Sequence, residues 1–214
     1  MRIQSFISQH IYLTILAILG WFALVSQLYL NLRYAEGDTI EILVRYISYF
    51  TITTNLLVAI CCTTLLVKPG NQFFSSQKTL TAITAYILVV GIVYNLILRS
   101  MWNPTGLQKI VDEILHVVVP LMFLFYWIFF TRKNKLEWTA ILPWLIYPLV
   151  YLIFILLRGT ASGYYPYPFM NVDELGFKKV LINSAGITVG LIVISLVLIG
   201  VGNRQSGIGN EAFK

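Results

Sequence analysis

The sequence predicts an all-α membrane protein with six transmembrane helices, and two observations carry this prediction. Hydrophobic residues make up 58% of the 214 residues and charged residues only 11%, whereas soluble domains contain about a quarter charged residues. Six apolar stretches, each near the ~20 residues that a helix needs to cross a ~30 Å hydrocarbon layer, cover most of the chain: 11–32, 44–67, 80–98, 111–130, 139–157 and 180–201. Little sequence remains outside them, so we expect a single compact six-helix domain over residues 1–214.

The first stretch, 11–32, is expected to stay as a helix in the mature protein. Its apolar core is longer than that of a secretory signal peptide, and no small-residue cleavage site follows it. The side of the membrane that carries both termini and the RKNK loop at 132–135 holds eight of the 15 basic residues. We therefore expect both termini to be cytoplasmic, and the basic pI of 9.3 to reflect orientation in the membrane rather than nucleic-acid binding.

The second stretch, 44–67, carries many hydroxyl and amide side chains for a membrane helix. Thr51 is expected ~10 Å below the outer surface at 1.5 Å per residue, and Ser48 and Asn55 share its helical face. Threonines and asparagines often bond only their own helix or a neighbouring one. Polar groups inside a bilayer are costly, however, so three of them on one face indicate a functional surface.

The third and fourth stretches bring further polar residues to the outer half of the membrane. Asn95 and Arg99 share one face of the third stretch. In the fourth, His116 lies about two turns below the outer surface, one turn after Asp112 and Glu113. A neutral imidazole accepts protons near pH 7, so His116 is a candidate base; the alternative is a histidine that only bonds a neighbouring helix.

The fifth and sixth stretches are less informative. Tyr151 and Arg158 share a face of the fifth. Arg158, like Arg99, either reaches towards lipid phosphates or holds an anionic headgroup. The loop GYYPYPFM at 163–170, which contains Tyr167, is either an aromatic belt at the interface or a lid stiffened by its prolines.

The polar residues converge at one depth, whereas the inner halves of the stretches are aliphatic. We therefore expect a cavity that opens towards the outer leaflet, lined by Thr51, Asn55, Asn95 and His116, with a hydrocarbon floor suited to an acyl chain. Cys61 and Cys62 are adjacent in a predicted helix, which excludes a disulfide between them. No metal-ligand spacing occurs, and no cofactor is expected.

Five segments occur in the order YFTITTNLL, VYNLILR, ILHVVVPLMF, PWLIYPLVYLIFILLRG and YYPYPF. Together they resemble the androgen-inducible membrane proteins and their bacterial relatives, from the second stretch to the start of the sixth. The resemblance implies an integral-membrane threonine hydrolase of fatty acid esters of hydroxy fatty acids, here in a bacterial plasma membrane, with Thr51 as nucleophile and His116 as base. The animal proteins carry an aspartate shortly after their threonine, so Thr53 and Thr54 stay open as alternatives to Thr51.

On this reading the partners are a lipid or fatty-acyl ester and the membrane, and no nucleic acid is involved. Either Asn55 or Asn95 would donate to the oxyanion, while Asp112 or Glu113 would orient the histidine. The residues expected to bind substrate are Asn55, Asn95, Arg99, Tyr151, Arg158 and Tyr167. The alternatives are a non-catalytic lipid-binding or transport protein, and a scaffold whose polar stripe only joins helices.

Overall fold

The computed structural model describes the main chain of residues 2–211 and the side chains of residues 7–206. Over residues 2–211 the regular structure is helical and contains no β-strand. Six helical segments are long and apolar enough to cross a membrane: Ile7–Tyr34, Phe50–Val67, Gln77–Met101, Gly106–Phe130, Trp138–Ser162 and Phe177–Ser206. The predicted all-α class with six spans is thus confirmed, and the chain is a multi-pass membrane protein.

The chain divides into two compact units, Met1–Asn134 and Lys135–Lys214, which we call the N-terminal unit and the C-terminal unit. The prediction of one domain over residues 1–214 stays a prediction, as does the cytoplasmic location of both termini.

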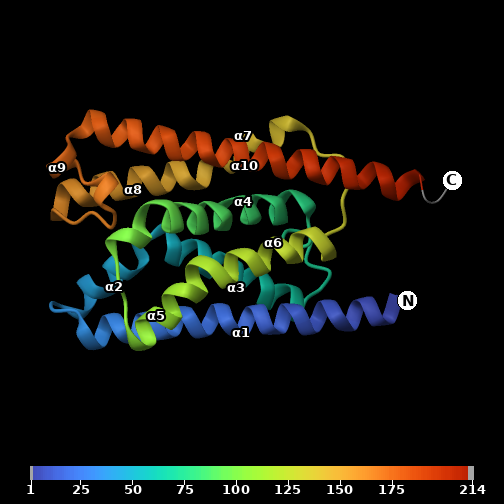
Figure 1. Ribbon diagram of the computed structural model, residues 1–214, viewed down its shortest axis with the longest axis horizontal. Coiled ribbons are helices and arrows are strands. Elements are labelled where there is room, and N and C mark those ends of the chain that lie inside the picture. Colours follow the sequence, from blue (N-terminus) through green and yellow to red (C-terminus); the bar gives the residue numbers. More distant parts are fainter. Residues whose placement is uncertain (1, 212–214) are drawn as a thin grey trace. The chain divides into compact units, whose positions relative to one another are not determined.

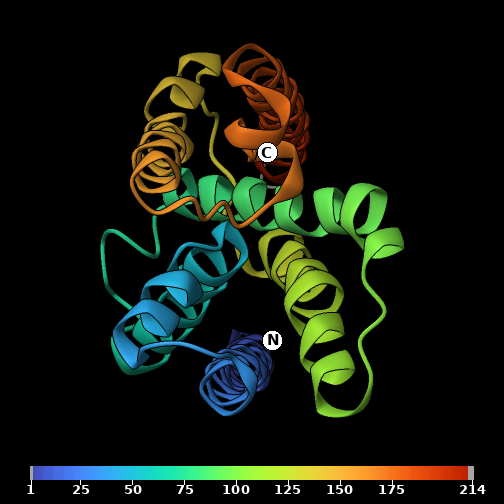
Figure 2. The same cartoon turned by 90° about the vertical axis from the view of Figure 1, so that its left-hand side faces the viewer.

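The N-terminal unit contains four spans. Its elements are α1 (Arg2–Tyr34), α2 (Thr39–Ile47), α3 (Phe50–Val67), α4 (Gln77–Val93), the π-helical η1 (Tyr94–Leu98), the 3₁₀ turn η2 (Arg99–Met101), α5 (Gly106–Glu113), the π-helical η3 (Ile114–Val118) and α6 (Val119–Phe130) (Figure 1). Figure 2 looks along α1, with α3 and α6 on either side of it and α4 across them.

Small residues allow α1 and α3 to pack closely. A Cβ atom at Gly20 would lie 3.5 Å from the Cβ of Ala59, which is fully buried together with Cys61 and Cys62. Close approach through small side chains is how membrane helices gain packing contacts where the hydrophobic effect does not draw helices together. Both cysteines are free thiols.

The predicted helix 44–67 is interrupted, which corrects the sequence prediction. α2 ends at Ile47, and Tyr49 has extended backbone angles (φ −82°, ψ 126°) before α3 begins. The Ser48 hydroxyl donates to Val44 O at 2.6 Å, so this serine closes the last turn of α2 and does not continue the face of Thr51. A side chain that bonds its own backbone competes with helix continuation.

Tyr46 fixes the end of α2 against α1. Its hydroxyl donates to Leu24 O at 2.8 Å, and burial raises the pKa of Tyr46 to about 12. The phenol therefore stays neutral and keeps its proton for this bond at physiological pH.

The C-terminal unit contains the other two spans. Its elements are η4 (Trp138–Ala140), α7 (Ile141–Trp144), α8 (Ile146–Ser162), η5 (Pro168–Met170), α9 (Val172–Leu175) and α10 (Phe177–Glu211). Asn203 joins the beginning of the unit to its last helix, since its side chain accepts from Leu136 N at 2.7 Å and donates to Leu136 O at 2.9 Å. Gly163 ends α8 with a left-handed conformation (φ 68°), which glycine adopts without steric cost.

Candidate functional site

Thr51 and His116 lie against each other. The break before α3 places Thr51 in the first turn of that helix, where it is 8% exposed, and its Oγ1 lies 3.3 Å from His116 Nε2. Thr53 has a different environment, because its hydroxyl donates to Phe50 O at 3.2 Å in its own helix. Thr54 is fully buried. Of the threonines that the sequence left open, Thr51 is therefore the one whose described contact is with the histidine.

The other ring nitrogen of His116 determines which tautomer is present. His116 Nδ1 lies 2.9 Å from the main-chain oxygen of Asp112, and a carbonyl oxygen can only accept a hydrogen bond. Nδ1 must therefore carry the proton when the ring is neutral, which leaves the lone pair of Nε2 directed at the Thr51 hydroxyl. In this tautomer the Nε2 lone pair is positioned to accept the Thr51 proton.

The Asp112 carboxylate is the third member of this arrangement. Its Oδ1 lies 3.3 Å from His116 Nδ1, and both side chains are about one-tenth exposed, at 9% and 11%. The Tyr94 hydroxyl donates to the other oxygen, Oδ2. Asp112 thus accepts from Tyr94 while facing the protonated nitrogen of His116, an arrangement that stabilises a positive charge on the imidazole ring.

Tyr94 also holds the plane of the histidine. The rings of Tyr94 and His116 stack with centroids 3.8 Å apart and an interplanar angle of 16°. The sequence did not identify Tyr94 as a site residue, although it directly precedes Asn95 in the segment VYNLILR. On a regular helix neighbouring residues point about 100° apart, so no helical-face argument could include both.

The His116 backbone lies in a π turn, and Pro120 explains why. Val119 N–H donates to Ile114 O, five residues back, rather than to Leu115 O as in an α-helix. Pro120 has no N–H, so it can donate to neither Leu115 O nor His116 O. Two carbonyls inside a membrane segment consequently need other donors.

The two asparagines supply these donors. Asn55 donates from Nδ2 to Leu115 O at 3.2 Å, and Asn95 donates from Nδ2 to His116 O at 3.3 Å. Each Nδ2 also donates to the carbonyl four residues earlier in its own helix, at 2.9 Å and 2.8 Å respectively. Both hydrogens of each amide are therefore engaged with backbone, so this geometry favours a role in holding the π turn over the predicted oxyanion role.

Gly91 allows the two π-containing segments to meet. A Cβ atom at this position would lie 3.1 Å from His116 O and 3.3 Å from the Pro120 Cβ. Both distances are shorter than ordinary van der Waals contact, so a larger residue would push the His116 turn away from α4.

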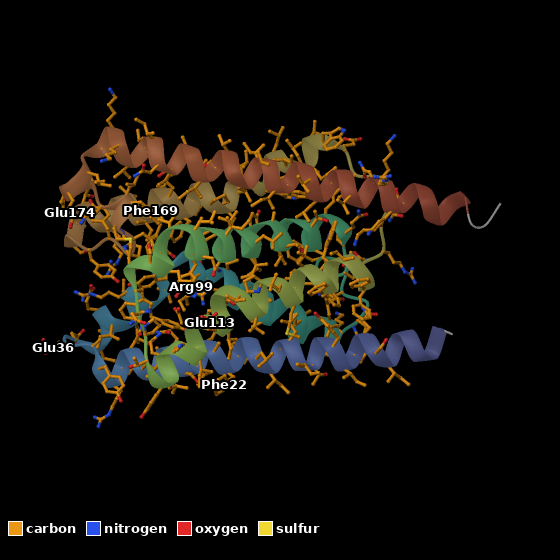
Figure 3. The ribbon with its side chains drawn as sticks, in the orientation of Figure 1. Phe22, Glu36, Arg99, Glu113, Phe169 and Glu174 are labelled. Atoms are coloured by element: carbon orange, nitrogen blue, oxygen red, sulfur yellow. The ribbon has the colours of Figure 1, made fainter. Side chains whose placement is uncertain are left out.

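Arg99 lies in η2, at the end of the same unit that contains α2 and α5 (Figure 1). Its guanidinium forms an ion pair with Glu113 and donates to Asn95 Oδ1 at 2.7 Å; Figure 3 labels Arg99 and Glu113 side by side. The Arg99 and Glu113 side chains are 43% and 38% exposed. Glu113 thus neutralises the positive charge of Arg99, which the sequence analysis had assigned to a substrate carboxylate. The carboxylate that lies against His116 is Asp112.

The remaining predicted substrate residues belong to the C-terminal unit. Arg158 donates to Tyr164 O at 3.3 Å and lies over the Tyr164 ring at 4.6 Å. Tyr167 is buried and stacks on Phe169 with centroids 5.1 Å apart, while Tyr151 is half-buried on α8. Their proposed contact with substrate stays a prediction.

A cavity of 510 Å³ occurs elsewhere in the N-terminal unit, lined by Leu30, Asn31, Tyr34, Ala35, Thr105, Gly106, Leu107 and Gln108. None of the residues predicted to line an outward-opening cavity belongs to it, so that prediction stays untested. Among the described side chains, no group of three or more histidine, cysteine, aspartate or glutamate residues could hold a metal ion.

Comparison with protein families, with curated proteins and with solved structures finds no match for this chain.

Proposed function

We propose that this protein is an intramembrane lipid ester hydrolase with Thr51 as nucleophile and His116 as general base. The observation that carries the proposal is the chain of contacts from the Thr51 hydroxyl through both nitrogens of His116 to Asp112. A hydroxyl is a weak nucleophile until an adjacent base takes its proton, and that base needs a third group that orients it. Of the two carboxylates that the sequence offered for orienting the histidine, the contact with His116 Nδ1 favours Asp112.

The first half of the reaction forms an acyl-enzyme. His116 Nε2 takes the Thr51 proton as Oγ1 attacks the ester carbonyl carbon, and the carbonyl oxygen becomes an oxyanion. The imidazolium formed is stabilised by the Asp112 carboxylate. When the intermediate collapses, the C–O bond of the ester breaks and His116 gives its proton to the leaving alcohol.

The second half returns the enzyme to its starting state. His116 Nε2 takes a proton from water, whose oxygen attacks the acyl carbon. Collapse then breaks the bond to Thr51 Oγ1, which recovers the proton from His116, and the carboxylic acid is released. No other reactant is required.

The N-terminus of α3 favours this chemistry at Thr51. The intrahelical bonds of α3 begin with Ile52 N and Thr53 N, which both donate to Tyr49 O. Thr51 therefore lies where an 18-residue helix carries its partial positive charge, and such a charge stabilises anions that form nearby.

The surroundings favour a lipid substrate. α3 and the segment Gly106–Phe130 are both candidate membrane spans, and a substrate that reaches Thr51 must enter an apolar environment. Esters with long acyl chains, including fatty acid esters of hydroxy fatty acids, partition there through the ~0.8 kcal/mol gained per buried CH₂. Aqueous esters with short chains should be poor substrates.

Hydrolysis of p-nitrophenyl octanoate by purified protein in neutral detergent tests the proposal. We expect Thr51→Ala and His116→Ala to lose activity by about a hundredfold or more, and Thr51→Ser to retain a measurable rate because it keeps the hydroxyl. Thr53→Ala is the matched control, since the Thr53 hydroxyl donates to Phe50 O in its own helix, and it should keep the wild-type rate. Full activity in His116→Ala would rule out this mechanism, and no hydrolysis by the folded wild type would favour a lipid-binding role.

A further inference from the structure

The end of the N-terminal unit opposite to α2 and α5 contains a second group of buried polar residues. α4 begins and α6 ends at this end (Figure 1). Two hydrogen bonds join them: Trp127 Nε1 donates to Thr81 Oγ1 at 2.8 Å, and Asn134 N donates to Gln77 Oε1 at 2.6 Å. We call the residues Gln77, Thr81, Trp127 and Thr131 the α4/α6 cluster.

Among the side chains of residues 7–206, two polar groups of this cluster are buried without a hydrogen-bond partner. They are Gln77 Nε2 and Thr131 Oγ1, on residues that are each 8% exposed. The orientation of the Gln77 amide is fixed, because the Asn134 N–H requires an acceptor and so faces Oε1. The Nε2 group therefore presents N–H donors, and Thr131 presents a hydroxyl. Buried donors left unpaired are destabilising, so the site suits a ligand with acceptor oxygens.

Charge and helix polarity favour an anion at the same place. Gln77 is the first residue of the 17-residue helix α4, and the side chain of its N-cap, Ser76, makes no capping bond. The exposed Lys78 and Arg132 adjoin Gln77 and Thr131 in the sequence. The N-terminus of a helix attracts anions through its N–H groups and dipole. The carboxylates of the described N-terminal unit come from the α1–α2 and α5 segments instead: Glu36, Asp38, Glu41, Asp112 and Glu113.

Lys133 has a separate structural role here. Its amine donates to Trp127 O and to Thr131 O, which are carbonyls at the end of α6, and it lies 3.9 Å from the centroid of the Trp127 ring. Lysine near a helix C-terminus satisfies carbonyls that lack intrahelical donors. Lys133 therefore stabilises the end of α6, whereas Gln77 Nε2 and the Thr131 hydroxyl remain available to bind a ligand.

We propose that the α4/α6 cluster binds a phosphate group, with Gln77 Nε2 and the Thr131 hydroxyl as donors and with Lys78 and Arg132 supplying charge. Gln77 begins one candidate span and Phe130 ends another, so the cluster lies at the level of the lipid headgroups. The phosphodiester of an anionic phospholipid and free phosphate share this chemistry. The site uses none of the residues of the proposed hydrolase reaction, so the two proposals are tested independently of each other.

Thermal unfolding of the purified full-length protein in dodecyl maltoside tests the site. Three probes are titrated: dihexanoyl phosphatidylglycerol, dihexanoyl phosphatidylcholine and inorganic phosphate. We expect phosphatidylglycerol to raise the Tm with saturation. A matching effect of inorganic phosphate would identify the phosphate group alone as the ligand, whereas an effect of phosphatidylglycerol without one of phosphate would identify the lipid. If no probe raises the Tm of the wild type, the proposal is wrong.

Gln77→Glu is the decisive variant because it keeps the acceptor for Asn134 N and replaces the Nε2 donor by an anionic oxygen. It should raise the phosphatidylglycerol concentration that gives half of the Tm increase by about tenfold or more. Asn71→Asp adds the same charge in the adjoining loop and keeps the acceptor that Phe74 N uses, so it should weaken binding less than about threefold. Equal losses in the two variants would mean diffuse attraction and would overturn the site. Thr131→Val, which keeps the side-chain shape, tests the site separately if Gln77→Glu does not fold, and unchanged binding in that variant would also overturn it.

Discussion

At the scale of single residues, His116 is defined by what contacts each of its two nitrogens. The family resemblance implied the pairing of Thr51 with His116, and helical spacing placed the two at a similar depth. Asp112 and Glu113 were left equal as orienting groups. The structure separates them: Asp112 faces Nδ1, and Glu113 pairs with Arg99. In a sequence both carboxylates are one turn from the histidine, so only the side-chain geometry distinguishes them.

Replacing Asp112 by asparagine should lower hydrolysis by about tenfold to a hundredfold, which is less than the loss in His116→Ala. The reason is that the substitution would remove the charge opposite the imidazolium, while the main-chain carbonyl of residue 112 would still hold the proton on Nδ1. The measurement is kcat for p-nitrophenyl octanoate, with Glu113→Gln as control. A larger loss in Glu113→Gln than in Asp112→Asn would contradict the assignment.

The hydrogen-bond acceptors of Asn55 and Asn95 could not be predicted from the sequence. The position of the two side chains near the site follows from helical spacing, but the groups to which they donate depend on carbonyls that only the folded backbone leaves unpaired.

We therefore expect Asn55→Leu to lower the free energy of unfolding by about 1–3 kcal/mol, because Leu115 O would lose its donor in a buried position. The exposed loop substitution Asn103→Ala should leave stability unchanged. Thermal unfolding in detergent measures both. An unchanged Tm in Asn55→Leu would mean that this bond does not hold the π turn.

At the scale of elements, three departures from the predicted helices occur around the candidate site: the break before α3 and the π turns η1 and η3. In the C-terminal unit the stretch 139–157 is divided as well, into η4, α7 and α8. Residues 44–67 were predicted as one helix, yet the break at Ser48 and Tyr49 places Thr51 at a helix N-terminus. Hydrophobicity identifies a span by length and composition, and neither changes at such a break. π turns have the same character, because they insert one residue without altering the apolar pattern.

Pro120→Ala tests the origin of the π turn at His116. The new N–H group can donate to His116 O, which favours a regular helix and rotates the imidazole away from Thr51. We expect hydrolysis to fall by about tenfold or more while thermal stability stays equal or rises, since proline is a poor residue in helix interiors. Pro143→Ala, in α7, is the control for the same substitution at a different helix. Unchanged activity in Pro120→Ala would mean that Pro120 does not determine the position of the His116 imidazole relative to Thr51.

At the scale of the whole molecule, composition was sufficient to predict the six spans, because a chain with 11% charged residues has too few polar groups to cover a large soluble core. Every predicted stretch except 44–67 lies within one span of the structure. The division into two units had no signal in the sequence, since the RKNK loop resembles any short connection between spans.

Orientation is testable because both native cysteines are fully buried and should react poorly with aqueous maleimides. A cysteine at the exposed position Glu36 should be labelled by an impermeant maleimide in intact cells. One at the exposed position Gln72 should be labelled only after permeabilisation, because the predicted orientation puts its loop in the cytoplasm. The reverse pattern would place both termini on the outer side.

Whether His116 activates Thr51 as a nucleophile can be determined by identifying the residue that an activated phosphonate modifies. Purified protein in neutral detergent is treated with a long-chain fluorophosphonate, which phosphonylates an activated hydroxyl with loss of fluoride, and the site is located by peptide mass spectrometry. We expect an adduct on Thr51 in the wild type and in Thr53→Ala, and none in His116→Ala. An adduct on Thr53, or equal labelling of Thr51 with and without His116, would contradict this expectation.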